Sequence, residues 1–429
     1  MLNALGLLKE RRFLPLFVTQ FLGAFNDNLF KTSMVLFATY QVYNDARIES
    51  NFNALATSLQ ILPFFLLSAL SGQLADTLDK SRIIRIVKLA EIGIMILGAG
   101  GLLAAKAGFV TLGIAMMLGA VLCLGTHATF FGPIKYALLP QHLNEDEVLA
   151  GTGLVEAGTY ISVLIGTIVA GWISVEAAAV TVLVVAVIGY LAGRMVPPAP
   201  RMGSQLVVDF NPITSSWRLV SETMHIPRLF LAICAISFFW AIGAVLIITF
   251  PPLVKNVLTA DKQVASGVIA IFSVGVAIGS VIINWLLGGK VSAKYAPASV
   301  IAMGLLVVAF SVVARMWMPA PAGQLFSITQ FFEHPQALLV VSSLAGIAIT
   351  GGMFVVPLYA FLTTTVAKDL TARTVAANNV VNSGAMVVGA AIVLGLTAMH
   401  VTPENMLLLA AGMCVVSAWL AQKLHLACD

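Results

Sequence analysis

The sequence predicts an all-α, polytopic membrane protein with about twelve transmembrane helices in two six-helix halves. Composition is the first observation: 59% of the 429 residues are hydrophobic and 10% are charged, and the mean hydropathy is +0.98. Segment length is the second. A membrane-spanning helix needs roughly 20 apolar residues, and the charged and Pro/Gly-rich breaks divide the chain into about twelve such segments. Neither observation fits a soluble domain.

The expected spans follow one another with short connections, apart from one long break. They are 13–40, 52–75, 83–105, 108–128, 148–172, 174–196, 229–254, 263–287, 296–318, 336–362, 375–397 and 403–424. The break at 197–228 is the longest polar stretch, so we expect a six-helix bundle at 1–196, a cytoplasmic linker, and a second bundle at 229–429. Alternating apolar and polar residues at 217–226 are typical of a short helix at the membrane surface, although a plain tether stays open.

The distribution of lysine and arginine predicts that both termini are cytoplasmic. With a cytoplasmic N-terminus and twelve spans, 17 of the 23 basic residues fall in cytoplasmic segments or towards the cytoplasmic ends of spans, five fall on the other side, and Lys31 is left inside the membrane. Basic residues favour the cytoplasmic side of a membrane. An odd number of spans would remove this bias.

The first span contains a polar stretch, Asn26-Asp-Asn28, followed by Lys31. An ionised carboxylate within a span costs roughly 2.5–3.5 kcal/mol on insertion scales, so Asp27 is expected to face a partner or a water-filled cavity. Lys31 lies four residues after Asp27, and this spacing predicts an ion pair. Two interpretations are open: a pair that only joins helices, and a substrate or ion pathway.

Two further carboxylates lie within expected spans. Glu156 has glycines nearby that allow close helix contact, and both a cavity role and a structural hydrogen bond are open for it. Glu91 lies three residues after Lys88 on one helical face, which predicts a structural ion pair. The histidines and cysteines show no spacing typical of metal ligands or disulfides, so neither a metal nor another cofactor is expected.

The connection between the second and third spans reads Gly72-Gln-Leu-Ala-Asp-Thr-Leu-Asp-Lys-Ser-Arg82. Asp76 is expected to accept hydrogen bonds from free N–H groups at a helix N-terminus. The stretch resembles the loop signature of the major facilitator superfamily, Gly-x-Leu-Ala-Asp-Arg-x-Gly-Arg-Lys. The matching positions are Gly72, Leu74, Ala75, Asp76 and, in basic character, Lys80; the departures are Thr77, Asp79 and Ser81. The resemblance implies a gating role for Gly72, Asp76 and Lys80, with Arg82 in place of the second basic residue.

Several segments together resemble the bacterial lysophospholipid transporter family of that superfamily. They are Ala24-Phe-Asn-Asp-Asn28, Phe131-Gly-Pro-Ile-Lys-Tyr136, Gly153-Leu-Val-Glu-Ala157 and Gly352-Met-Phe-Val-Val-Pro-Leu-Tyr-Ala360. Two more, Ser237-Phe-Phe-Trp240 and Ala376-Ala-Asn-Asn379, are similar to the branch in which the transporter is fused to acyltransferase and acyl-carrier-protein ligase domains. One departure is the apolar run after Trp240, where some members of the family carry a basic residue.

The resemblance implies a function as well as a fold. Lysophospholipids such as lysophosphatidylethanolamine would move by alternating access across the bacterial inner membrane to the cytoplasmic leaflet, where a separate acyltransferase would act on them. Lys135 would meet the phosphate, and Asp27 or Glu156 would meet the ammonium. The other pathway positions are Asn26, Asn28, Lys31, Tyr136, Trp240, Asn378, Asn379 and Asn382. We expect a monomer in the lipid bilayer, without a nucleic-acid partner.

Other function classes fit the sequence less well or equally well. A proton- or cation-coupled drug or small-solute carrier, with Asp27 or Glu156 titrating, is open, and only substrate choice separates it from lysolipid transport. An acyltransferase of the relevant class needs His with Asp five positions on, whereas His142 is followed there by Glu147. ATP hydrolysis would need a Gly-x-x-x-x-Gly-Lys-Ser/Thr loop, which the chain lacks. The charges within spans disfavour a non-transporting scaffold.

Overall fold

The computed structural model describes residues 6–200, 209–287, 292–364 and 371–428. Within these ranges the regular structure is helical, apart from one isolated β-bridge between Ala260 and Phe326. The chain forms two compact units. Unit 1 comprises Met1–Phe37 and Leu66–Ser216, and unit 2 comprises Ala38–Phe65 and Trp217–Asp429.

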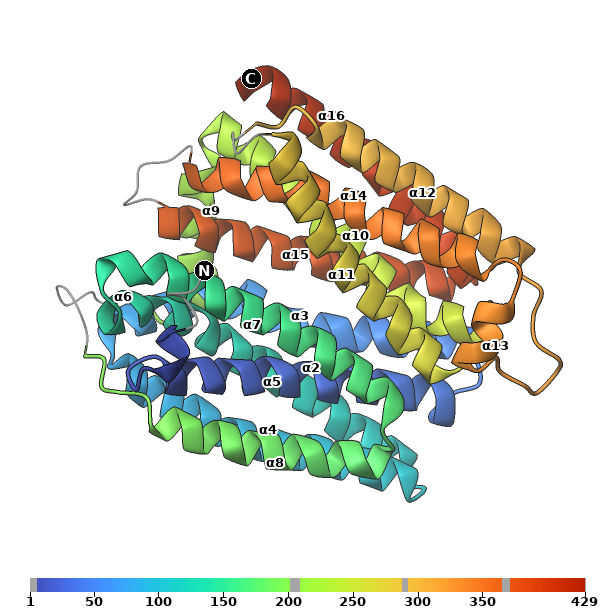
Figure 1. Cartoon of the computed structure of the whole chain (residues 1–429), viewed down its shortest axis with the longest axis horizontal. Coiled ribbons are helices and arrows are strands. Elements are labelled where there is room, and N and C mark those ends of the chain that lie inside the picture. Colours follow the sequence, from blue (N-terminus) through green and yellow to red (C-terminus); the bar gives the residue numbers. More distant parts are fainter. Residues whose placement is uncertain (1–5, 201–208, 288–291, 365–370, 429) are drawn as a thin grey trace. The chain divides into compact units, whose positions relative to one another are not determined.

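Unit 1 is a bundle in which long helices run side by side (Figure 1). Its helices are η1 (Leu7–Lys9), α2 (Leu14–Phe37), the second part of α3 (Ala46–Thr77), α4 (Lys80–Lys106), α5 (Val110–Ala137), α6 (Leu139–His142), α7 (Glu145–Trp172) and α8 (Val175–Arg194). Helix α4 packs against α5 and α8, and α2 packs against α7 and α8. The polar stretch of α2 therefore lies among helices that can supply partners for it.

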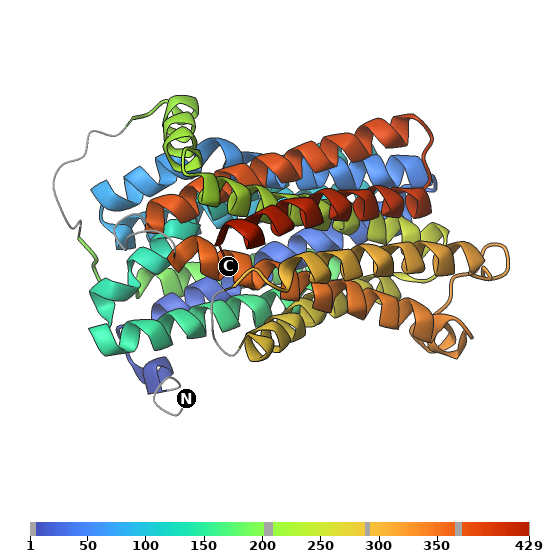
Figure 2. The same cartoon turned by 90° about the horizontal axis from the view of Figure 1, so that it is seen from above.

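Unit 2 is a second bundle of long helices (Figure 2). It contains the π-helical turn η2 (Ala38–Val42), the first part of α3, α10 (Pro227–Asn256), α11 (Lys262–Leu286), α12 (Ala296–Met316), α13 (Ile328–Glu333), α14 (Ala337–Thr364), α15 (Thr371–Ala398) and α16 (Pro403–Cys428). Helix α10 packs against α14, α15 and α16, while α14 also packs against α11 and α12. Helix α9 (Pro212–Met224) begins in unit 1 and ends in unit 2.

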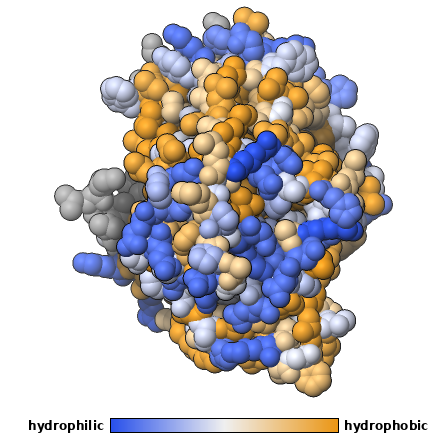
Figure 3. All heavy atoms as spheres, turned by 90° about the vertical axis from the view of Figure 1, so that its right-hand side faces the viewer, coloured by the Kyte–Doolittle hydropathy of each residue, from blue (hydrophilic) through white to orange (hydrophobic). Residues whose placement is uncertain are grey.

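The fold class agrees with the sequence prediction. In the described part of the chain each expected span corresponds to one long helix, and eleven of these helices are long and apolar enough to cross a membrane. The remaining one, α2, is less apolar because polar residues interrupt it between Gln20 and Ser33. Figure 3 is viewed from the right-hand side of Figure 1, and hydrophilic side chains gather there among hydrophobic ones. The division at 1–196, 197–228 and 229–429 stays a prediction.

Side-chain caps explain where several helices begin. Asp79 accepts hydrogen bonds from the backbone N–H groups of Ser81 at 2.8 Å and Arg82 at 3.2 Å, and so caps α4. Partial burial raises the pKa of Asp79, but these hydrogen bonds and one from the Ser81 hydroxyl outweigh it and hold that pKa below its ordinary value. The prediction that Asp76 occupies a helix N-terminus is wrong. Asp76 lies in the last turn of α3, and its side chain is outside the described residues.

Helices α11 and α14 approach so closely that each needs a glycine at the contact. A Cβ atom on Gly279 would collide with the carbonyl oxygen of Ile349, and one on Gly352 would collide with the carbonyl oxygen of Val276. Both obstacles are backbone atoms, which cannot turn aside as a side chain can. Small residues of this kind allow helices in a membrane to associate by van der Waals packing.

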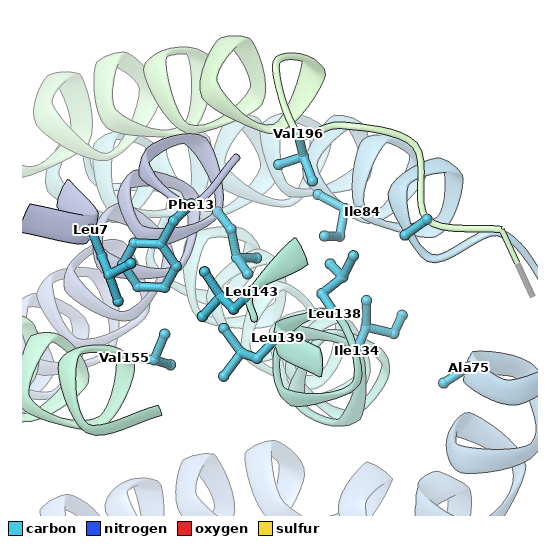
Figure 4. Close-up of a cluster of buried hydrophobic side chains, with 12 residues drawn as sticks. Leu7, Phe13, Ala75, Ile84, Ile134, Leu138, Leu139, Leu143, Val155 and Val196 are labelled. Carbon is cyan, nitrogen blue, oxygen red and sulfur yellow. The ribbon is translucent and has the colours of Figure 1, made fainter. Parts of the chain in front are cut away.

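A cluster of apolar side chains joins one end of the helices in unit 1 (Figure 4). Phe13 precedes α2, Ile84 lies in α4, Ile134 in α5 and Val155 in α7, and none of the four is more than 1% exposed. Val196, just after α8, packs into the same cluster. Because these contacts are dense, the ends of the five helices are held as one body.

A buried ion pair anchors the start of α3 to α10 within unit 2. Lys255 Nζ donates to Glu49 Oε1 at 2.6 Å and to the backbone oxygens of Thr39 and Tyr43 at 2.5 Å and 2.7 Å. Asn256 Nδ2 donates to Glu49 Oε2 at 2.5 Å. Glu49 is 0% exposed, and both of its oxygens are hydrogen-bonded. This is the condition under which a buried charge is tolerated.

Lys255→Met is expected to lower the free energy of unfolding by about 1–3 kcal/mol. The substitution removes the ammonium that donates to the buried carboxylate of Glu49. Of the two side-chain donors described above, only Asn256 then remains. Thermal unfolding of the purified protein in detergent measures the change. The double variant Lys255→Met with Glu49→Gln removes both charges and should be more stable than the single variant. If Lys255→Met unfolds like the wild-type protein, the ion pair contributes nothing to stability.

Candidate functional site

Four polar side chains from three helices meet inside unit 1, and we term them the buried charge cluster: Asn26 of α2, Lys88 and Glu91 of α4, and His127 of α5. Asn26 Nδ2 donates to Glu91 Oε1 at 3.1 Å. Glu91 Oε2 is paired with Lys88 Nζ and lies 3.2 Å from His127 Nε2. The ion pair predicted from the spacing of Lys88 and Glu91 is thus confirmed, and its side chains are 1% and 0% exposed.

Glycines of neighbouring helices make room for Lys88. A Cβ atom on Gly23 of α2 would lie 3.3 Å from Lys88 Nζ, and one on Gly189 of α8 would lie 3.1 Å from Nζ and Cε. One turn on, a Cβ atom on Gly193 would lie 3.4 Å from the aliphatic stem. A Cβ atom at Gly23 or Gly189 would therefore require Lys88 to shift by a few tenths of an ångström, whereas one at Gly193 would make an ordinary contact. Small residues on α2 and α8 therefore permit a buried lysine on α4.

Asp27 lies beside the buried charge cluster. The charges of His127, Glu91, Lys88 and Lys135 act on its carboxylate. Its Oδ1 atom is buried and has no hydrogen-bond partner among the described residues. A buried carboxylate oxygen that accepts no hydrogen bond lowers the stability of the folded protein. At such an atom a ligand or a water molecule can supply the missing donor.

The predicted ion pair between Asp27 and Lys31 is wrong. None of the ion pairs between described residues joins Asp27 to Lys31. Lys31 is one turn away on the same helix, whereas Asp27 has the positive groups of α4 and α5 close to it. No other ion pair of Asp27 within the described residues takes the place of the predicted one.

Lys135 of α5 lies near two carboxylates. The charges of Glu156 on α7 and of Asp27 on α2 both act on its ammonium. The structure therefore groups three of the predicted pathway residues. Asn28 instead turns back onto its own helix, where Nδ2 donates to the carbonyl oxygen of Ala24 at 2.9 Å. The side chain of Tyr136 lies outside the described residues.

A second group of polar side chains, in unit 2, carries no charge. Trp240 Nε1 on α10 donates to the hydroxyl oxygen of Tyr359 on α14 at 2.8 Å, and Asn382 Nδ2 on α15 donates to the same oxygen at 3.2 Å. Ser237 Oγ donates to Asn382 Oδ1 at 2.8 Å. We term these four residues the neutral network. Two predicted pathway residues, Trp240 and Asn382, thus meet at Tyr359.

The adjacent asparagines of α15 have different surroundings. Asn378 is 0% exposed and its side chain lies beside the Tyr359 hydroxyl. Asn379 is exposed, and its backbone oxygen accepts a hydrogen bond from Ser383. Of the two predicted residues, only Asn378 therefore lies at the neutral network.

The predicted gating residues lie at the junction of α3 and α4. Lys80 is 3% exposed, and its N–H donates to the carbonyl oxygen of Ala199 at 3.0 Å, whereas Arg82 is exposed. A Cβ atom on Gly72 would meet no atom within 4 Å, so packing in this conformation does not require glycine there. The signature stretch is therefore connected to the segment that follows α8.

The linker contacts the same stretch through Gln73. Gln73 Oε1 accepts from the N–H of Asp209 at 2.7 Å, and Gln73 Nε2 donates to Ser215 Oγ at 3.3 Å. The helix expected in the linker is present as α9. Its residues Ile213 and Trp217 are 71% and 74% exposed, as a helix at a membrane surface requires.

Two residues that complete these sites were not among the predicted ones. His127 belongs to a set of histidines without metal-ligand spacing, and no signal in the sequence links it to Glu91. Tyr359 lies within the segment Gly352 to Ala360, which resembles the transporter family. That resemblance is the signal that could have identified Tyr359.

The chemistry of the two groups differs. In unit 1, the open acceptor of Asp27 can hold an ammonium or a proton, and Lys135 can hold a phosphate. In unit 2, the neutral network can bind only by hydrogen bonds and ring contacts. No group of three potential metal ligands occurs in the described part of the chain. The residues of unit 1 therefore suit an ionic group, and those of unit 2 suit an uncharged polar group.

The chain is similar in sequence to known transporters. A model of the Major Facilitator Superfamily matches residues 16–390. Proteins called lysophospholipid transporter LplT are 25% identical in Cronobacter sakazakii, 26% in Salmonella typhimurium and 25% in Photorhabdus laumondii. These matches cover 83%, 81% and 80% of this chain and 81%, 78% and 78% of the respective relatives.

Solved structures share the fold. The nucleoside transporter NupG has a TM-score of 0.65 at 15% identity, covering 97% of this chain and 99% of that one. A bacterial homologue of the iron transporter ferroportin, in an inward-facing state, has a TM-score of 0.68 at 10% identity, covering 97% and 98%. At these identities the similarity concerns the fold alone. Since the family model matches most of its length, the chain belongs to the Major Facilitator Superfamily and is a multi-pass membrane transporter rather than an enzyme.

Proposed function

We propose that the protein moves lysophospholipids, such as lysophosphatidylethanolamine, across the bacterial inner membrane to the cytoplasmic leaflet by alternating access. A separate acyltransferase would then restore the second acyl chain. The observation that carries the proposal is the similarity, over 80–83% of the chain, to relatives called lysophospholipid transporter. Both termini would be cytoplasmic, in keeping with the excess of basic residues that the sequence assigns to that side.

The charged groups of unit 1 suit a zwitterionic headgroup. Lys135 would bind the phosphate and Asp27 the ammonium, while Glu156 would orient Lys135. The open Oδ1 atom of Asp27 supports this assignment, because an ammonium would supply the missing donor. A hydrogen bond to a charged group contributes about 1.5–3 kcal/mol. The buried charge cluster ties α2 to α4 next to Asp27 and so keeps its carboxylate in place.

A proton- or cation-coupled carrier for a drug or small solute is the second candidate. The observation that favours it is again Asp27, whose open acceptor beside His127 could take a proton instead of an ammonium. The two candidates differ in what is transported. Lysolipid transport requires a substrate with an acyl chain, whereas the second candidate requires a water-soluble substrate and a proton or cation gradient.

Gly72, Asp76, Lys80 and Arg82 would form the gating loop of this transporter. Asp76→Ala is expected to change the ratio of inward to outward access by roughly fivefold or more, as a coupling of 1–3 kcal/mol would. Reactivity of single cysteines introduced at each membrane face, in a background without native cysteines, measures this ratio. Unchanged reactivity at both faces would remove Asp76 from gating.

Asp79→Ala is the matched control for that experiment. It removes the N-cap of α4 and should cost about 1 kcal/mol of stability. Because Asp79 departs from the superfamily signature, its substitution is not expected to change the access ratio. A change as large as that of Asp76→Ala would mean that any damage to this loop alters gating.

Uptake of labelled lysophosphatidylethanolamine into spheroplasts without a lysolipid transporter of their own tests the proposed function. We expect the protein to restore uptake, and uptake to persist when the proton gradient is collapsed. If the protein reaches the membrane without restoring uptake, lysolipid transport is excluded and the small-solute carrier becomes the leading candidate.

A further inference from the structure

The neutral network lies among helix segments that carry no charge. Helix α10 has no Asp, Glu, Lys or Arg between Arg228 and Lys255, and α14 has none along its whole length. At membrane depth an ionised ligand group needs a counter-charge close by. Helix α15, which supplies Asn382, has no charged residue between Thr374 and Ala398. The groups that unit 2 itself offers at the neutral network therefore suit an uncharged part of a substrate.

Hydrogen bonds fix the positions of the side chains in the network. The Tyr359 hydroxyl oxygen accepts from both Trp240 and Asn382. The hydroxyl of Ser237 donates to the oxygen of the Asn382 amide, which sets the orientation of that amide. Trp240 is 38% exposed, so one end of the network is open. These side chains are already ordered before a ligand binds. Binding therefore loses little of their conformational entropy.

Asn378 is the unsatisfied member of this group. Its side chain is 0% exposed and lies beside the Tyr359 hydroxyl. The Tyr359 hydroxyl is close enough to interact with it, but by distance and angle neither its Oδ1 nor its Nδ2 atom forms a hydrogen bond with the described residues. A buried carboxamide normally has partners, and one without them needs a ligand or water to complete it. An amide offers an acceptor and donors side by side, which matches a hydroxyl group, itself both donor and acceptor.

We propose that Asn378 and the neutral network bind the free glycerol hydroxyl of a single-chain phospholipid. This inference rests on the proposed function and adds the feature by which the substrate is recognised. The phosphate and amine of a lysophospholipid are charged and occur equally in diacyl lipids. In a diacyl lipid the second glycerol hydroxyl is esterified, so it has no proton to donate. A site for this hydroxyl therefore distinguishes lysophospholipids from the lipids of the surrounding bilayer.

The test compares two lipids that differ only at this hydroxyl. One is 1-acyl lysophosphatidylethanolamine, and the other is its 2-O-methyl ether, which keeps the chain, the headgroup and the oxygen but lacks the O–H. In competitive uptake, the wild-type protein should prefer the free hydroxyl by roughly tenfold or more. Asn378→Leu should reduce the preference to less than about twofold by slowing uptake of the free-hydroxyl lipid alone.

Asn284→Leu on α11 is the matched control, because Asn284 is exposed and distant in sequence from the network. It should leave the preference unchanged. Equal uptake of both lipids by the wild-type protein, or an undiminished preference in Asn378→Leu, would overturn the inference while leaving lysolipid transport in place. No uptake of either lipid by protein that reaches the membrane would overturn the proposed function and this inference together. The wild-type comparison decides even if Asn378→Leu does not fold.

Discussion

Lys88→Met is expected to lower the free energy of unfolding by about 3–5 kcal/mol. The substitution removes the cation from a pair whose side chains are 1% and 0% exposed, and leaves the carboxylate of Glu91 buried. Asn26 and His127 remain near that carboxylate, but the ammonium is its one permanently charged partner among the contacts described. Thermal or denaturant-induced unfolding in detergent micelles measures the loss.

Two controls separate the lost pair from a general effect of the substitution. The double variant Lys88→Met with Glu91→Leu removes both charges and should recover most of the loss, because an apolar pair of similar volume avoids the uncompensated charge. Lys106→Met breaks the partly exposed pair with Glu176, whose side chains are 44% and 49% exposed, and should change stability by about 1 kcal/mol or less. If Lys88→Met were no more damaging than Lys106→Met, the buried pair would not stabilise the helix packing of unit 1.

Asp27→Asn is expected to reduce uptake of lysophosphatidylethanolamine by roughly tenfold to a hundredfold. The loss of one hydrogen bond to a charged group, about 1.5–3 kcal/mol, corresponds to that range. The variant should reach the membrane and unfold like the wild-type protein, since Asn has nearly the same shape and Asp27 is outside the Lys88–Glu91 pair. Initial uptake rates at matched protein levels measure the effect.

Two comparisons make the role of Asp27 specific. Asp27→Glu keeps the charge and should retain more uptake than Asp27→Asn. Lysophosphatidylglycerol has the phosphate but no amine, so its uptake should be less affected by Asp27→Asn than uptake of the ethanolamine lipid. Equal losses for both lipids would mean that Asp27 does not bind the ammonium, and near-normal uptake of both would remove it from the mechanism.

The positions of the helices could be predicted because hydropathy acts locally along the chain. The expected span 174–196 corresponds to α8, Val175–Arg194. Helix ends were harder to predict. Helix α5 passes through Pro133 and continues to Ala137, beyond the expected end at 128, because a membrane helix tolerates proline. Helix α3 starts before its apolar part, at a turn that includes Glu49, whose partner Lys255 is far away in sequence.

The contacts of the candidate site could be predicted only within one helix. The Lys88–Glu91 pair followed from a spacing of three residues, but the same reasoning wrongly predicted a pair between Asp27 and Lys31. The charges of groups on α4 and α5 act on Asp27, and spacing within α2 cannot reveal them. In unit 2 the residue types were recognised, whereas the hydrogen bond between Trp240 and Tyr359 joins positions on different helices. No periodicity in the sequence encodes a contact of that kind.

The central claim, that this chain moves lysophospholipids across a bilayer, is tested most directly with purified protein in liposomes. Labelled lysophosphatidylethanolamine is added outside, and albumin then extracts the lipid that remains in the outer leaflet. Our account predicts that the albumin-protected fraction grows with time faster in vesicles containing the protein than in protein-free vesicles, and more slowly with Asp27→Asn. Equal protection with and without correctly folded protein would contradict the account.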